Sequence, residues 1–134
     1  MTSQRLTKIS KAIYKALNKE ENIILAYIYG STAREKEHPF SDIDIAILLK
    51  EPSIDKTIKI HSILTDSLGE KVDTLLLNLA PPILKYQVIK NGIRIISKNE
   101  EARIAFESKA LSEGLDENFL ITKVKEAITK RLSS

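Results

Sequence analysis

The sequence predicts an α/β fold of the α+β type, in which a small mixed sheet is covered by helices. Apolar runs typical of strands alternate along the chain with the three- and four-residue spacing typical of helices. A length of 134 residues with 43% hydrophobic residues suits one compact domain, and no linker or repeat divides the chain. We therefore expect a single domain over residues 1–134.

The first half of the chain predicts a helix, two strands and a short helix between the strands. Apolar residues at steps of three and four indicate an N-terminal amphipathic helix that covers the sheet: Leu6, Ile9, Ile13 and Leu17. The run Ile23–Tyr29 is apolar throughout, as expected for a buried strand, and ends at Gly30. A short helix is expected over 32–37 and a second buried strand over 42–50.

The second half predicts two more strands and three helices. Ser53 can cap a helix that ends at Gly69, and its apolar residues are Ile54, Ile58 and Leu64. Strands are expected over 71–79 and 93–97, with a helix between Pro82 and Gly92. The C-terminal helix is expected over about 118–132, with its apolar stripe packed on the domain or, alternatively, bound to a partner: Leu120, Val124, Ile128 and Leu132.

The composition excludes several classes of site. The chain has no cysteine, so a metal ion would be bound through oxygen or imidazole ligands. The net charge is +3, but the basic residues are interspersed with acids, and aromatic residues make up only 5%. Direct binding of nucleic acid is therefore not expected. No signal peptide or membrane span is evident, so we expect a cytoplasmic protein without membrane association.

The segment GSTAREKEHPFSDID carries the most informative pattern. Asp42 and Asp44 are two residues apart on a strand and therefore face the same side, where their charges repel unless a cation lies between them. Asp73 is a third acid, in the otherwise apolar third strand, and would join them if the two strands are neighbours. Three carboxylates together suit Mg²⁺ and can hold two ions roughly 4 Å apart for transfer of a phosphoryl or nucleotidyl group.

A turn after the first strand supplies the second half of the predicted site. Gly30 allows the backbone to approach a phosphate, and the backbone amides and the hydroxyl of Ser31 offer hydrogen-bond donors to it. Arg34 lies one helical turn further on and can add positive charge toward a triphosphate, although a surface salt bridge is an equal alternative. For Asp73 the alternative is a solvent-exposed acid on an edge strand.

Gly30-Ser31, ten intervening residues, Asp42-x-Asp44 and a later Asp-bearing strand resemble the signature of the DNA polymerase beta-like nucleotidyltransferase superfamily. More narrowly, LAYIYGSTAR, SDIDIAILL and LNLAPPILKYQVIKNGIRII are similar to minimal nucleotidyltransferases (MNT), the antitoxin partners of HEPN toxins. The resemblance implies a nucleotidyltransferase fold in which three aspartates bind Mg²⁺: Asp42, Asp44 and Asp73. It also implies that Gly30 and Ser31 hold the phosphates of the nucleotide.

The same resemblance implies an enzyme that moves AMP from ATP to an acceptor hydroxyl, a tyrosine of a HEPN toxin partner. An antitoxin that acts by binding and occlusion without catalysis is the alternative, and a small-molecule transferase would need a helical domain for which the chain is too short. Homo- or hetero-oligomers are compatible with either function. The remaining polar candidates are expected in the core, at its rim or on the surface: Tyr27, Tyr29, Tyr86, His38 and His61.

Overall fold

The computed structural model of the chain describes residues 4–33, 42–69 and 71–133. Within these ranges one sheet forms, with the strand order β3-β2-β1-β4. Its strands are β1 (Ile23–Tyr29), β2 (Ile43–Leu49), β3 (Val72–Leu76) and β4 (Ile93–Ser97). β2 pairs with β3 in parallel, whereas β1 pairs with β2 and with β4 in antiparallel. The predicted mixed sheet is thus confirmed.

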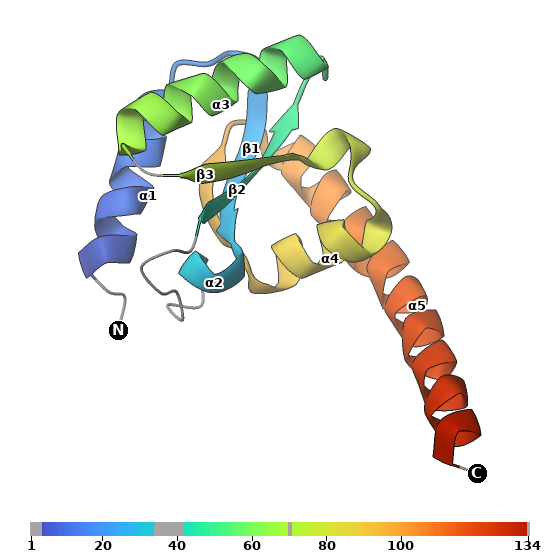
Figure 1. Ribbon diagram of the computed structural model, residues 1–134. Helices are drawn as coiled ribbons and strands as arrows, with labels where there is room; N and C mark the ends of the chain where they lie inside the picture. Colours follow the sequence, from blue (N-terminus) through green and yellow to red (C-terminus); the bar gives the residue numbers. More distant parts are fainter. Residues whose placement is uncertain (1–3, 34–41, 70, 134) are drawn as a thin grey trace.

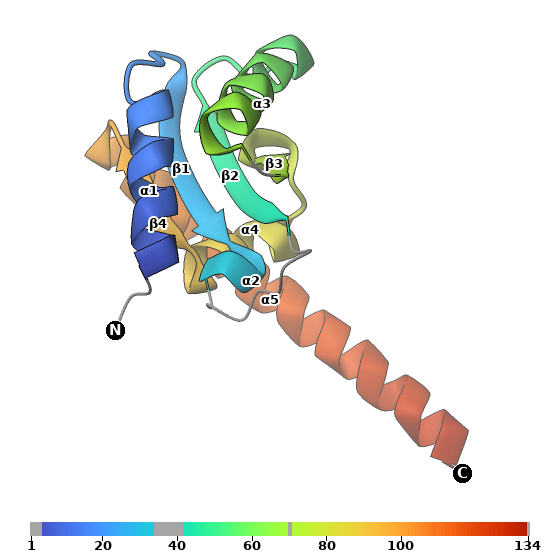
Figure 2. The same cartoon turned by 60° about the vertical axis from the view of Figure 1, so that its left-hand side comes forward.

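Helices cover both faces of the sheet (Figures 1 and 2). α1 (Gln4–Leu17) and α3 (Ile54–Leu68) lie on one face. α4 (Pro82–Asn91) and the first half of α5 (Glu100–Ser133) lie on the other. The short helix α2 (Gly30–Ala33) follows β1 directly, and the 3-10 turn η1 (Leu77–Leu79) follows β3. The predicted short helix over 32–37 therefore begins two residues earlier, and its part beyond Ala33 lies outside the described residues.

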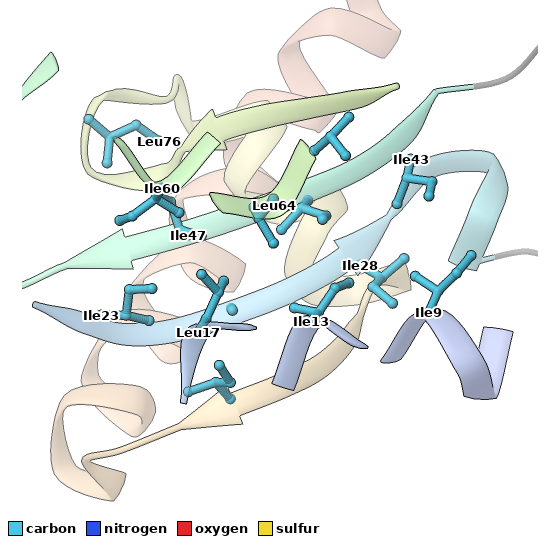
Figure 3. Packing of buried hydrophobic residues seen from close by; sticks show 14 of the residues in the cluster. Ile9, Ile13, Leu17, Ile23, Ile28, Ile43, Ile47, Ile60, Leu64 and Leu76 are labelled. Carbon is cyan, nitrogen blue, oxygen red and sulfur yellow. The ribbon is translucent and has the colours of Figure 1, made fainter. Parts of the chain in front are cut away.

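The larger core lies between the sheet and the pair α1 and α3 (Figure 3). The predicted N-terminal stripe is confirmed, since all four of its residues are buried: Leu6, Ile9, Ile13 and Leu17. They meet the sheet residues that point to the same side, including Ile28, Ile43, Ile45 and Ile47. β1 and β2 are buried over most of their length because they are the two inner strands of the sheet.

α3 begins and ends where the sequence predicts. The Ser53 hydroxyl accepts a hydrogen bond from the Lys56 amide at 3.0 Å, and Gly69 ends the helix with φ 63°. The helix buries Ile60 and Leu64, but Ile54 and Ile58 are exposed. Of the apolar residues by which the helix was predicted, Leu64 is therefore packed and Ile54 and Ile58 are not, because the sheet meets the helix along the row that contains Ile60 and Leu64.

α5 is a single helix of 34 residues. The expected helical segment 118–132 is its second half. The helix passes through Gly114, where a Cβ atom would lie 2.1 Å from Cβ of Tyr86 in α4, so the glycine allows the two helices to touch. Val124, Ile128 and Leu132 are exposed, and their predicted packing against the domain was wrong because the helix continues past the end of α4 (Figure 1). None of the described helices has the length and apolar character needed to cross a membrane.

Candidate active site

Strand pairing places two of the predicted acids side by side. In the parallel pair of β2 and β3, Asp44 is the register partner of Asp73. Both residues lie on the sheet face covered by α4 and α5, because Ala46 and Leu75, each two residues further along the same strand, pack in the core on that face. Neighbouring strands are about 4.8 Å apart, so the two carboxylates share one small region.

The two acids have different surroundings. Asp44 is partly buried on the inner strand β2, whereas Asp73 is exposed on the edge strand β3. Asp42 lies immediately before β2 and is also exposed. The second and third strands are neighbours, which was the condition for Asp73 to join the other acids. Asp73 is also exposed on an edge strand, as the alternative interpretation of this residue supposed.

Gly30 lies directly against the carboxylate of Asp44. A Cβ atom on Gly30 would be 2.3 Å from Oδ2 and 3.2 Å from Cγ of Asp44. The residue also has φ 70°, in the left-handed region that side chains rarely adopt. The sequence suggested that a glycine is needed here for approach to a phosphate. The structure adds a nearer reason, because the Asp44 carboxylate occupies the space that a side chain would need.

Tyr29 is a site residue that the sequence did not single out. It precedes Gly30 and is the register partner of Asp44 across the antiparallel pair of β1 and β2. Its pKa is raised from 10.0 to about 12, first by burial and then by the negative charges of Asp44 and Asp73. The phenol therefore stays protonated to a higher pH than an ordinary tyrosine. In the sequence, only its position directly before Gly30 and Ser31 indicates that Tyr29 lies at the site.

Hydrogen bonds at both ends of β3 fix its register against β2. At one end the Ile43 amide donates to the Lys71 carbonyl at 2.9 Å. At the other end the side chain of Asn78 accepts from the Leu49 amide and donates to the Leu49 carbonyl, each at 2.9 Å. A shift of one residue would turn Asp73 to the opposite face, so these contacts hold it beside Asp44.

His61 and Thr74 tie β3 to the helix behind it. Nδ1 of His61 in α3 lies 2.9 Å from the Thr74 hydroxyl in β3. Thr74 follows Asp73 and faces the opposite side of the sheet. His61 was expected on the surface of its helix, but it is partly buried in this contact. It lies on the far face of the sheet from the acids.

A family model described as "Polymerase beta, Nucleotidyltransferase" matches residues 11–101, which include β1, α2, β2 and β3 with all of the acids described above. The chain belongs to this nucleotidyltransferase family.

Two relatives of this nucleotidyltransferase come from Methanocaldococcus jannaschii. One, MJ1217, is named as a candidate protein adenylyltransferase; it is 37% identical over 96 residues, which cover 70% of this chain and 98% of the relative. The other, MJ0435, carries the same kind of name and is 32% identical over 72 residues, covering 53% of this chain and 77% of the relative.

Solved structures of similar fold come from toxin–antitoxin complexes. A complex described as a toxin–antitoxin with AMP-PNP contains a chain with a TM-score of 0.68 and 21% identity, covering 93% of this chain and 98% of that one. A structure of a tri-AMPylated HEPN toxin in complex with an MNT antitoxin, from Shewanella oneidensis, contains a chain with a TM-score of 0.66 and 21% identity, covering 96% of this chain and 99% of that one. At this identity the likeness shows that the nucleotidyltransferase shares their fold.

The other predicted binding residues are placed only in part. Ser31 is the second residue of α2, but its side chain lies outside the described part of the chain. Arg34 and His38 lie outside the described residues altogether. Tyr27 and Tyr86 are buried in the core, as expected.

The described acids offer oxygen donors of the kind that Mg²⁺ prefers. Among residues 4–33, 42–69 and 71–133, no three His, Cys, Asp or Glu side chains lie close enough together to form a complete metal site. Asp44 and Asp73 nevertheless fit such an ion, because they are register partners on adjacent strands and each supplies carboxylate oxygens. Asp42, which the sequence predicts as the third ligand, is a described residue but does not complete a group of three with them in this structure.

Proposed function

We propose that this chain transfers AMP from ATP to a hydroxyl group of a protein partner in the cytoplasm, a tyrosine of a HEPN-family toxin. The observation that carries the proposal is the pairing of Asp44 with Asp73 beside the close approach of Gly30. The relatives named as candidate adenylyltransferases and the fold shared with antitoxins in AMPylated toxin complexes support this substrate class.

Each predicted residue has a distinct role in the proposed reaction. Gly30 and Ser31 begin α2 and would hold the phosphates through backbone amides, with Arg34 adding positive charge. The residues that would hold Mg²⁺ are Asp42, Asp44 and Asp73. Mg²⁺ bound there would neutralise charge on the triphosphate and on the departing pyrophosphate.

The transfer exchanges one phosphorus–oxygen bond for another. The acceptor oxygen forms a bond to the α-phosphorus of ATP, the bond from that phosphorus to the β-phosphate bridging oxygen breaks, and pyrophosphate leaves. The proton of the acceptor hydroxyl passes to a carboxylate oxygen of Asp73, which is exposed at the edge of the sheet and can reach a group on another molecule. Asp44, by contrast, lies against Gly30, so its carboxylate is held in a fixed position and is less suited to reach another molecule.

The proposal is tested with the purified chain, ATP labelled at the α-phosphate, Mg²⁺ and a purified HEPN-domain protein encoded in the same genome. We expect label on the HEPN-domain protein, and a rise in its intact mass by whole AMP units. Asp44→Asn and Asp73→Asn should each reduce the rate by at least about 100-fold. Asp66→Asn removes an exposed acid of α3 instead and should leave the rate unchanged.

Chelation with EDTA should stop the labelling, and added Mg²⁺ should restore it. The modified residue is identified by fragmentation of the labelled peptide. A stable complex of the two proteins with no mass increase would favour the alternative of inhibition by occlusion and would overturn the proposal.

A further inference from the structure

The second half of α5 leaves the body of the domain (Figures 1 and 2). We name residues 118–133 of this helix the overhang. Three of its described apolar side chains are largely exposed, Val124 58%, Ile128 53% and Leu132 82%, and Ile121 is partly buried. With Ile121 they follow one another at steps of three and four, so they form one narrow stripe along the helix.

The apolar stripe of the overhang continues the helix face that packs on the domain. In the first half of α5 that face includes Ala110, which is buried, and Gly114, which meets Tyr86 of α4. Gly114 and Ile121 are seven residues apart, close to two turns of helix, and therefore lie on the same side. A molecule that covers the stripe would lie on the side of α5 on which α4 lies and would extend that packed layer.

The overhang projects outward from the same end of the domain that carries the candidate active site (Figures 1 and 2). α2 lies at this end, with Gly30 at its start and Asp44 beside it (Figures 1 and 2). A protein lying along the overhang is thus held at the end of the domain where ATP would bind.

Charge on the overhang selects the kind of partner. Its basic residues are Lys123, Lys125, Lys130 and Arg131, and its only acid in the sequence is Glu126, which gives 4 − 1 = +3. This equals the net charge of the whole chain, so the remainder is neutral overall. Two overhangs side by side would bring like charges together, which disfavours a second copy of this chain as the occupant.

We infer that the overhang is the docking surface for the acceptor protein, which binds the stripe in an apolar groove bordered by acidic residues. An amphipathic helix in an apolar groove is a common mode of protein recognition. Docking there would position the acceptor hydroxyl without a separate substrate-binding domain, since positioning accounts for a large part of the rate of a transfer reaction. This inference rests on the proposed transfer of AMP to a protein.

The test compares Ile128→Glu with Ala127→Glu in the full-length chain. Both add one negative charge at neighbouring exposed positions of the same helix, but only residue 128 lies on the stripe. We expect Ile128→Glu to raise the KM for the HEPN-domain protein by at least about 10-fold with little change in kcat at saturation. Ala127→Glu should raise it far less, and both variants should bind ATP as the unaltered chain does.

A second stripe variant, Leu132→Glu, guards against an effect peculiar to one position, and circular dichroism checks that each variant keeps its helix content. The KM of the unaltered chain should also rise with added NaCl, because salt screens the attraction between the basic overhang and an acidic rim.

If the unaltered chain labels the partner and both stripe variants label it equally well, the docking inference is wrong although the proposed function stands. If the unaltered chain labels no partner, the proposed function itself fails. The inference is equally overturned if Ile128→Glu abolishes only self-association, or only binding to vesicles of anionic lipid, while labelling is unchanged.

Discussion

Replacement of Gly30 by alanine tests the geometry of the site most directly. The new Cβ atom would lie 2.3 Å from Oδ2 of Asp44, whereas an ordinary contact begins at 3.4 Å. The carboxylate must therefore retreat by about 1 Å, because the backbone on the other side belongs to the junction of β1 and α2. A misplacement of about 1 Å at a reacting centre can cost about 100-fold in rate.

The same substitution also strains the backbone, and a second glycine allows the two effects to be separated. Gly30 has φ 70° and Gly69 has φ 63°, so alanine at either position costs about 1–2 kcal/mol of stability. At Gly69 a Cβ atom would meet nothing within 4 Å. Gly69→Ala is therefore a control that has the strain but not the clash with Asp44.

The assay measures the free energy of unfolding by urea titration and the rate of AMP transfer at saturating ATP. We expect both variants to lose similar stability, but only Gly30→Ala to lose about 100-fold in rate. If Gly30→Ala transfers AMP within about 3-fold of Gly69→Ala, then the position of the Asp44 carboxylate does not limit the reaction and our account of the site is refuted.

Two further predictions concern the surroundings of the site, and a third concerns the contact between α4 and α5. The pKa of Tyr29 is raised to about 12, so its contribution to stability is full below pH 10 and is lost as the pH rises toward 12. In Tyr29→Phe, the free energy of unfolding measured by urea titration should therefore fall less between pH 10 and pH 12, by up to about 2 kcal/mol. Asn78→Ala removes both hydrogen bonds to Leu49 and should cost about 1–3 kcal/mol, with a reduced transfer rate, by the same titration and assay. Gly114→Ala places a Cβ atom 2.1 Å from that of Tyr86 and should cost about 1–3 kcal/mol despite the better helix propensity of alanine; unchanged stability would contradict close packing of α4 on α5.

Local patterns were sufficient to predict most of the elements. The spacing of Leu6 to Leu17 marked the buried face of α1, and Ser53 and Gly69 marked the ends of α3. These signals lie within a few residues of the structure that they specify, so a single sequence shows them. The buried strands β1 and β2 were recognised for the same reason, since each is a continuous apolar run.

Contacts between distant segments could not be predicted in this way. The role of Asn78 depends on β3 lying parallel to β2, which brings its side chain to Leu49, 29 residues earlier. The influence of the Asp73 charge on the pKa of Tyr29 depends on the same strand order, because β2 lies between their two strands. The predicted C-terminal helix began only at about residue 118, whereas α5 begins at Glu100 and passes through Gly114. A glycine within a helix is unfavourable unless a neighbour such as Tyr86 requires the space, and that neighbour is not visible in the sequence.

The order of the strands also explains why Asp44 and Asp73, which are register partners, are suited to different roles in the proposed transfer. Asp44 lies on the inner strand β2, with Gly30 and Tyr29 against it, so its carboxylate has little freedom to move. Asp73 is exposed on the edge strand β3, whose outer side pairs with no strand among the described residues. A fixed acid suits the nucleotide, whose phosphates must be held in line, and an exposed acid suits an acceptor that arrives on a second protein. In the proposed transfer, the sheet would therefore accommodate the two substrates from opposite sides of the strand pair β2 and β3.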